Sequence, residues 1–157
     1  MKTRQATPAD APQISAFLQQ LTALGKRRSP SDERFVQEHY ITHVDNIRCT
    51  VVEDDDGAIL GLQALKRATE GNVYGVTPGW GIIGTHVSPN AARRGVGRML
   101  FAATKKAAED SGLRKIDATI GEENAEGLAY YEAMGFRTYR TPDDCICKLY
   151  EVAARDV

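Results

Sequence analysis

The sequence is poor in cysteine, has no excess of either charge and contains no long apolar segment. Its 157 residues include three cysteines, a sparse and odd set that is typical of a reducing compartment, so we expect a cytoplasmic protein. Lys and Arg number 20 against 21 Asp and Glu, which excludes the basic surplus that general nucleic-acid binding requires. No apolar run approaches the roughly 18 residues of a membrane span, and residues 1–10 are too polar for a signal peptide. We therefore predict neither a nucleic-acid partner nor a membrane association.

The composition is that of an ordinary globular chain. Hydrophobic residues make up 42% and charged residues 26%, which argues against disorder. The length is about that of one domain and suffices to bury a core without disulfides or metals. No repeat, low-complexity tract or linker divides the sequence, so we predict a single domain over residues 1–157.

The spacing of apolar residues predicts a mixed α/β fold in the order β-α-α-β-β-β-α-β-α-β-β. The expected strands cover residues 2–6, 48–53, 58–65, 80–87, 116–120, 136–140 and 145–150. The expected helices begin at about residues 7, 29, 97 and 124. Because a helix joins the fourth and fifth strands, we expect these two to run parallel.

Two similar tetrapeptides predict the starts of the first two helices. Thr-Pro-Ala-Asp at 7–10 is typical of a capping box, and Ser-Pro-Ser-Asp at 29–32 repeats the pattern. Along one side of the second helix we expect Phe35, Val36, His39, Tyr40 and His43. His39 and His43 have metal-ligand spacing, but no third ligand is evident, so we predict no metal site.

The segment at 87–98, Val-Ser-Pro-Asn-Ala-Ala-Arg-Arg-Gly-Val-Gly-Arg, runs from a strand end into a helix start. Gly95 and Gly97 allow successive N–H groups to turn toward one point, beside a helix N-terminus and three arginines. This combination suits a pyrophosphate or another polyanion. A Rossmann loop is disfavoured because Leu100 occupies the place of the third glycine, and no Gly-Lys-Ser/Thr ending indicates a Walker A loop. The alternative is a helix entry turn with solvated arginines.

The segment at 124–136 carries a second signal. Asn124 and Tyr131 are seven residues apart, two helical turns, so both side chains project to the same side. A tyrosine held there can donate its phenolic proton to a leaving group. The alternative is an aromatic residue that packs in the core.

Together, in this order and about 30 residues apart, the two segments resemble the GNAT superfamily of acyl-CoA N-acyltransferases. The resemblance covers nearly the whole chain. It includes the tetrapeptide at 7–10, Asp-Asp-Asp-Gly at 54–57, Val-x-Pro at 87–89 and Tyr-Glu-x-x-Gly-Phe at 131–136. It implies a mostly antiparallel sheet flanked by helices. The chain departs from the family at Ala92, where the phosphate turn usually has Gln or Arg.

The resemblance also implies acetyl-CoA as co-substrate and direct attack by an amine. On this basis the strand ending at His86 and Val87 pairs with the pantetheine arm, and the Val87 N–H polarises the thioester carbonyl. Asn124 hydrogen-bonds the arm, and Tyr131 protonates the departing thiolate. On the same basis, the residues that bind the pyrophosphate are Arg93, Arg94, Gly95, Val96, Gly97 and Arg98.

No glutamate stands on the expected strand 80–87, where many members of the family have one. The candidate general base there is His86, whose ordinary pKa suits the role. The other candidates are Glu53, Asp117, Glu122 or a chain of waters. The lack of a strong base favours an amine of low pKa. An α-amine with a pKa near 8 is about one-tenth free base at pH 7, whereas a lysine amine is free only about once in two thousand.

We therefore predict an N-acetyltransferase that acts on a small amine, such as an amino acid. Ile120 and Gly121, followed by Asn124, also resemble phosphinothricin-type amino-acid N-acetyltransferases. The basic loop at 26–28 is either solvated or contacts an acidic group of the substrate or the CoA 3′-phosphate. Two alternatives remain: a peptide or protein N-acetyltransferase, which needs an open groove, and a catalytically weak CoA-binding regulatory module. The sequence does not determine the oligomeric state, and a homodimer is one alternative because similar proteins commonly dimerise.

Overall fold

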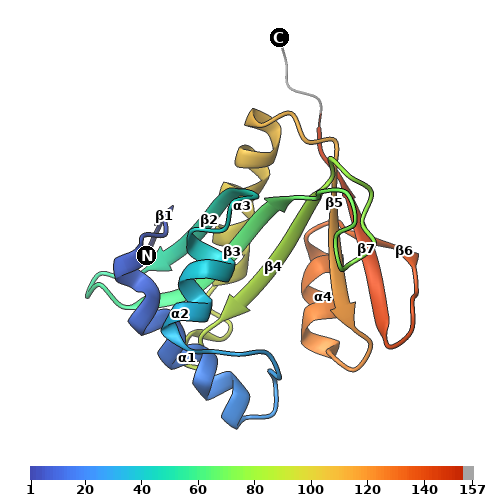
Figure 1. Ribbon diagram of the computed structural model, residues 1–157. Coiled ribbons are helices and arrows are strands. Elements are labelled where there is room, and N and C mark those ends of the chain that lie inside the picture. The colour runs from blue at the N-terminus through green and yellow to red at the C-terminus, as the bar shows by residue number, and fades with distance from the viewer. Residues whose placement is uncertain (154–157) are drawn as a thin grey trace.

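A seven-stranded sheet in the order β1-β2-β3-β4-β5-β7-β6 forms the framework of the computed structural model, which describes residues 1–153 (Figure 1). The strands are β1 (Lys2–Gln5), β2 (Asn46–Glu53), β3 (Ile59–Arg67), β4 (Gly81–Val87), β5 (Lys115–Gly121), β6 (Arg137–Arg140) and β7 (Cys145–Glu151). The helices are α1 (Ala11–Ala23), α2 (Glu33–Val36), α3 (Val96–Asp110) and α4 (Ala125–Ala133). All paired strands are antiparallel except β4 and β5. The predicted element order and the mostly antiparallel sheet are confirmed.

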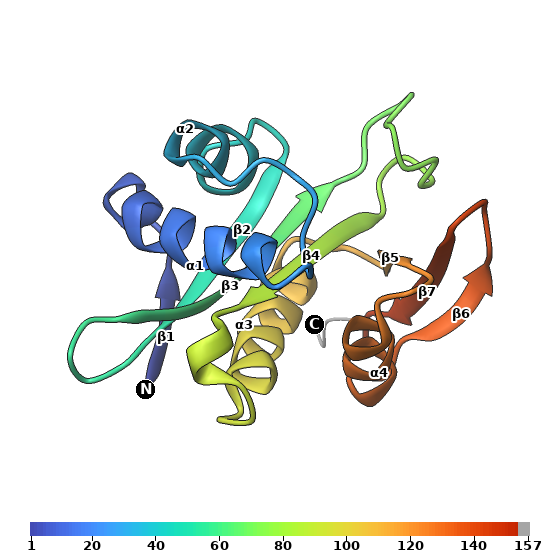
Figure 2. The ribbon, with the colours of Figure 1, turned by 90° about the horizontal axis from the view of Figure 1, so that it is seen from below.

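Helices cover both faces of the sheet (Figure 2). α1 and α2 lie on one side of β2 to β4, where Ile14 and Leu18 pack with Leu62 of β3 in a fully buried cluster. α3 and α4 lie on the other face, where the rings of Phe101 and Phe136 are 5.5 Å apart. β3 is therefore buried on both faces, which explains why its sequence is almost continuously apolar. No helix within residues 1–153 is both long and apolar enough to cross a membrane.

The first helix begins as its sequence predicts. The Thr7 N–H donates to the Asp10 carboxylate at 2.8 Å, and the reciprocal bond of the capping box is also present. The box opens a 3-10 turn, Pro8–Asp10, that leads directly into α1. Arg4 adds two bonds of 2.8 Å to the same carboxylate, so β1 and the helix start are fixed to each other.

The second helix differs from its prediction. Its N-cap is Asp32, which accepts from the Phe35 N–H at 3.2 Å, rather than Ser29. Aspartate is an equally good cap, and the residues just before it are held instead by the Arg27 side chain. After one turn α2 widens into a π-helical turn, Gln37–Ile41, so His43 lies beyond the helix.

β4 and β5 are joined over a very short length. They pair only at Gly81 with Ile116 and at Ile82 with Asp117. Beyond these positions the two strands diverge, as Figure 1 shows, and we call this opening the β4–β5 splay. α3 makes the crossover between the two strands, as predicted. The splay leaves one edge of β4 without a partner strand in the middle of the sheet.

Candidate active site

The free edge of β4 directs main-chain groups into the splay. The Ser88 N–H donates to the Leu60 carbonyl at 2.8 Å, so this opposed pair is hydrogen-bonded. Opposed pairs of an antiparallel ladder alternate between bonded and non-bonded, and the register between β3 and β4 has no shift. The N–H groups of Thr85 and Val87 therefore point away from β3 and into the splay. Val87 is thus free for its predicted role, and Thr85 offers a second donor that the sequence did not indicate.

The turn before α3 forms a cradle of N–H groups at a helix N-terminus. Gly95 is the N-cap of α3 with φ of +78°, a left-handed conformation that favours glycine. Arg93 also has a positive φ, of 64°, which its sequence did not predict. A Cβ at Gly95 would meet no atom within 4 Å, so the cradle is open to a ligand. The arginines at 93, 94 and 98 are exposed around it.

Gly97 was predicted to let its N–H group turn toward a ligand, but in the structure it allows α3 and α4 to pack closely. It is the second residue of α3 and has no positive φ. A Cβ there would lie 2.6 Å from the Tyr130 ring, so glycine is required for close packing between α3 and α4. The Tyr130 hydroxyl donates to the Gly97 carbonyl at 2.7 Å. This contact joins the turn before α3, the predicted phosphate turn, to the helix that carries the predicted acid.

Tyr131 lies inside the molecule at the base of the splay. Its side chain is 6% exposed, and its ring packs on Phe136 at a centroid distance of 5.1 Å. Its hydroxyl is 2.7 Å from the Thr85 hydroxyl on β4. Burial raises the pKa of Tyr131 above its ordinary value, although the bond to Thr85 opposes this. The phenol is therefore fully protonated at neutral pH, as a general acid must be.

Asn124, which the sequence pairs with Tyr131, is the N-cap residue of α4. Its side-chain oxygen accepts from the Gly127 N–H at 3.0 Å and so caps α4. Asn124 is exposed, whereas Tyr131 is buried. Capping uses the amide oxygen and leaves the amide N–H groups for any bond to a cofactor arm.

Gln63 and Tyr130, which the sequence did not single out, lie beside Thr85 and Tyr131 on this face of the sheet. Gln63 of β3 is fully buried and donates to the Tyr130 hydroxyl and to the Thr85 hydroxyl, each at 2.9 Å. Burial raises the pKa of Tyr130 to about 12. A glutamine within an apolar strand and a second tyrosine beside Tyr131 were the available signals, but their contact depends on the tertiary structure.

His86 lies on the opposite face of β4 from Tyr131. Its Nε2 is 3.2 Å from the Tyr40 hydroxyl. Burial, and to a lesser degree the nearby Arg27 and His39, lower the pKa of His86 to about 3. The imidazole is consequently neutral at pH 7 but only weakly basic, which argues against it as a strong general base.

The other candidate bases are engaged elsewhere or lie outside the splay. Glu53 accepts from Arg4 at 2.9 Å. Asp117 is fully buried and accepts from Thr119 at 2.7 Å and from Tyr139. Glu122 is exposed on the turn after β5.

The loop between α1 and α2 reaches across to the start of α4. The Lys26 ammonium forms an ion pair with Glu126 in the first turn of α4, at 2.9 Å. Both side chains are exposed, so the pair contributes little stability. It does show that the loop extends over the end of the splay.

Arg27 of the same loop is buried at 8% exposure. It donates to the Ser31 hydroxyl at 3.0 Å and to the Pro30 carbonyl at 2.6 Å. Its guanidinium lies 5.9 and 5.8 Å from the ring centroids of Phe35 and Tyr40. Among residues 1–153 it forms no ion pair with a carboxylate. The two hydrogen bonds and the two aromatic rings compensate part of the cost of burying this charge, and an anionic ligand would compensate the rest.

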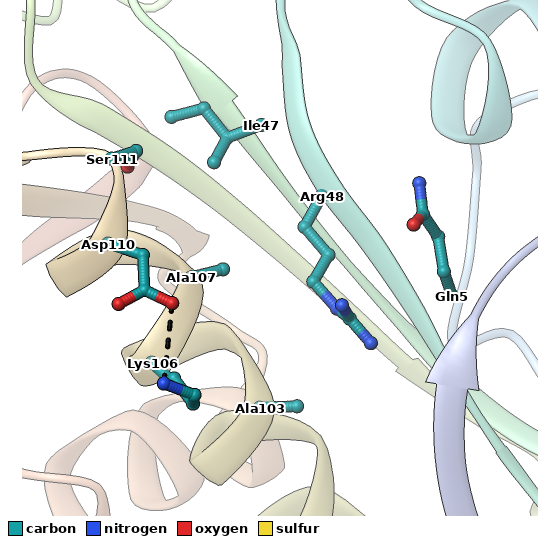
Figure 3. Close-up of a pocket in the computed structure, with 8 residues that line it drawn as sticks. All are labelled: Gln5, Ile47, Arg48, Ala103, Lys106, Ala107, Asp110 and Ser111. Carbon is teal, nitrogen blue, oxygen red and sulfur yellow. Dashed lines mark ion pairs between the residues drawn. The ribbon is translucent and has the colours of Figure 1, made fainter.

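A separate pocket of about 420 Å³ lies between α3 and the strands β1 and β2 (Figure 3). It is lined by Gln5, Ile47, Arg48, Ala103, Lys106, Ala107, Asp110 and Ser111. Lys106 and Asp110 form an ion pair of 3.4 Å at its rim (Figure 3). None of the predicted site residues lines it. In the described part of the chain, no group of three His, Cys, Asp or Glu residues could hold a metal ion.

The sequence that forms this fold and site matches the model of a known protein family. The model of the acetyltransferase (GNAT) family matches residues 15–136. This span includes the splay, the phosphate turn and α4. The chain therefore belongs to the GNAT acetyltransferase family, which confirms the resemblance of its two motifs.

Solved structures with a similar fold are GNAT proteins. The chain is similar to a GCN5-related N-acetyltransferase from Kribbella flavida, at 22% identity, a TM-score of 0.77 and 96% coverage of both chains. A phosphinothricin acetyltransferase from Sinorhizobium meliloti, in complex with AcCoA, has 18% identity and a TM-score of 0.75, over 96% of this chain and 88% of that chain. The ribosomal-protein-S18-alanine N-acetyltransferase from Escherichia coli has 16% identity and a TM-score of 0.73, over 99% and 96%. A comparison with curated proteins found no match. At these identities the similarity establishes the fold alone.

Proposed function

We propose that the protein transfers an acetyl group from acetyl-CoA to the primary amine of a small molecule that also carries an acidic group, such as an amino acid. The acidic group of the acceptor is inferred from Arg27, whose buried guanidinium has no carboxylate neighbour in the described residues. It lies on the side of β4 that faces α2, close enough to lower the pKa of His86. A carboxylate bound there would supply the missing negative charge.

The acetyl donor fits the observed donor groups. The cradle at Gly95 and the exposed arginines around it suit a pyrophosphate. The free edge of β4 offers N–H and C=O groups to an extended, amide-containing arm. When bound, acetyl-CoA supplies an activated thioester. The N–H groups of Thr85 and Val87 would stabilise negative charge on its carbonyl oxygen. Asn124 would bond the arm through its free amide N–H groups.

Tyr131 supplies the proton that the leaving thiolate needs. The amine attacks the thioester directly, and the phenolic O–H bond breaks as the S–H bond forms. No strong base is needed if the acceptor is an α-amine, because about one-tenth is already unprotonated at pH 7. His86 is a weak base at most, and we assign it to the wall of the acceptor site beside Tyr40.

The contact between Lys26 and Glu126 favours a small acceptor over a peptide. It brings the loop between α1 and α2 to the first turn of α4, whereas a peptide substrate needs an open groove. The retention of Tyr131 and Asn124 favours an enzyme over a regulatory module that only binds CoA. A homodimer and a cytoplasmic location remain predictions, and sedimentation of the purified protein tests the former.

The test is thiol release from acetyl-CoA with amino acids, polyamines, aminoglycosides and short peptides as acceptors. The proposal expects turnover with amino acids. For the best of them, Arg27→Met should raise KM at least 10-fold, while activity with the decarboxylated amine should change less than 2-fold. Arg28→Met is the matched control, since Arg28 is exposed and carries the same charge.

Three outcomes contradict the proposal. Turnover confined to peptides would favour the protein acetyltransferase, and CoA binding without turnover would favour the regulatory module. An equal loss with both acceptors in Arg27→Met would assign Arg27 to the structure of the loop instead of the acceptor.

A further inference from the structure

A continuous chain of hydrogen bonds runs beneath the splay from the phosphate turn to the predicted acid. It starts at the Gly97 carbonyl, which accepts from Tyr130 at 2.7 Å. Gln63 joins Tyr130 to Thr85 through two bonds of 2.9 Å. It ends where the Thr85 and Tyr131 hydroxyls meet at 2.7 Å. Gln63 at its centre is 0% exposed.

The direction of the bonds at Tyr130 follows from counting hydrogens. A carbonyl can only accept, so the single hydroxyl hydrogen of Tyr130 is committed to Gly97. The Tyr130 oxygen must then accept from Gln63, which fixes the amide nitrogen as the atom facing Tyr130 and Thr85. Both hydrogens of that nitrogen are thereby used. The amide oxygen of Gln63 is left buried without a partner in the described residues.

Thr85 has few hydrogen-bond partners. Its oxygen accepts from Gln63, and the only other hydroxyl or acceptor bonded to it within residues 1–153 is Tyr131. Either hydroxyl can be the donor in that second bond. When Thr85 donates, as a chain of bonds running in one direction favours, the phenolic hydrogen of Tyr131 has no acceptor among the described residues and is available to a substrate.

We infer that Thr85 and Gln63 are positioning residues for the proposed acetyl transfer, and that they aim the Tyr131 proton at the departing sulfur. This rests on the proposed role of Tyr131. As the C–S bond breaks, the Tyr131 O–H proton passes to sulfur. The negative charge left on the phenolic oxygen is held by the Thr85 hydroxyl, which keeps its own proton. Solvent returns a proton to Tyr131, in balance with the one that the attacking amine releases.

The test is a double-mutant cycle between Thr85 and Tyr131. Thr85→Val removes the hydroxyl at constant shape and should lower kcat by about 10- to 100-fold, the range for a hydrogen bond to a charged group. KM for acetyl-CoA should change less than about 2-fold. In a Tyr131→Phe background the same change should alter kcat less than about 2-fold, because the group that it positions is gone. Thr85→Ser should restore at least half of the wild-type kcat.

Gln63→Met should behave like Thr85→Val, with a smaller loss that also disappears in the Tyr131→Phe background. Thr104→Val is the matched control, because the buried Thr104 hydroxyl of α3 has no partner in the described residues. Its kcat should equal that of the wild type. Thermal unfolding of each variant checks the fold, and Thr85→Ala replaces Thr85→Val if the latter does not fold.

The outcomes separate the two proposals. If Tyr131→Phe itself retains the wild-type kcat, Tyr131 is not the acid, and the positioning role falls with it. If Tyr131→Phe lowers kcat but Thr85→Val costs the same factor in both backgrounds, the acid role stands and our inference is wrong. The inference is also overturned if Thr85→Val raises KM without lowering kcat, or if Thr85→Ser does not restore kcat.

Discussion

Gly97→Ala is the substitution whose effect the structure defines most sharply. A Cβ at this position would lie 2.6 Å from one carbon of the Tyr130 ring and 3.2 and 3.3 Å from two others. Ordinary carbon contacts are about 3.5–4.0 Å, so the ring must move by about 1 Å. Such a shift also breaks the hydroxyl bonds of Tyr130 to Gly97 and to Gln63.

The expected magnitude is a balance of opposing effects. Alanine in place of glycine favours a helix by up to about 1 kcal/mol. Overpacking of the ring costs about 1–3 kcal/mol, and the two lost hydrogen bonds cost about 1 kcal/mol each. We therefore expect Gly97→Ala to lower the free energy of unfolding by about 2–4 kcal/mol. In a Tyr130→Ala background the obstacle is absent, and Gly97→Ala should be neutral or stabilising by up to about 1 kcal/mol.

Urea unfolding of the four proteins in this cycle measures these energies. Gly95→Ala is the control, because a Cβ there meets nothing within 4 Å but must adopt a φ of +78°. It should cost about 1 kcal/mol whether or not Tyr130 is present. The reasoning is refuted if Gly97→Ala is as stable as the wild type, or if its cost persists without the Tyr130 ring.

Three further predictions concern catalysis, cofactor binding and pH. Tyr131→Phe should lower kcat about 100-fold with little change in CoA affinity; unchanged turnover contradicts its role. Gly95→Asp should abolish CoA binding in calorimetry, since it places a carboxylate in the cradle, and normal affinity would refute the assignment of the turn. The pKa of His39 is lowered to about 4 and that of His86 to about 3, mainly by burial. Between about pH 6.5 and 4 the unfolded chain therefore binds protons that the folded chain does not. The free energy of unfolding should fall as pH drops through that window, by at most about 1.4 kcal/mol per pH unit for each histidine. Urea midpoints at pH 7, 6 and 5 test this, and a flat profile contradicts it.

Local signals in the sequence predicted most of the fold. The capping box at 7–10 acts within a few residues, so the start of the first helix can be predicted from the sequence directly. The second helix was less predictable because two N-cap candidates, Ser29 and Asp32, stand three residues apart. In the structure Asp32 is the cap, and Ser15 and Arg27 bond to the residues just before it.

The residues of the candidate site can be predicted only where they form a local motif. The predicted phosphate turn and Tyr131 lie in segments with a local pattern, whereas Gln63 and Thr85 lie in strands whose patterns indicate only burial. Their contact is set by the register between β3 and β4, which pairs them directly. Likewise, Gly97 fits a phosphate-loop pattern in the sequence. The residue that requires a glycine there is Tyr130 of α4, 33 residues away.

The free edge of β4 has a consequence for how such a protein can change its specificity. Along this strand, consecutive side chains face opposite sides: Thr85 faces Tyr131, and His86 faces Tyr40. The main chain between them points in a third direction, into the splay. Every residue except proline carries the same N–H and C=O groups, so recognition along this edge is independent of side chains. Under the proposed roles, substitutions at His86 and Gly84 should change acceptor preference while donor binding along the main chain and the proposed proton transfer from Tyr131 stay unchanged.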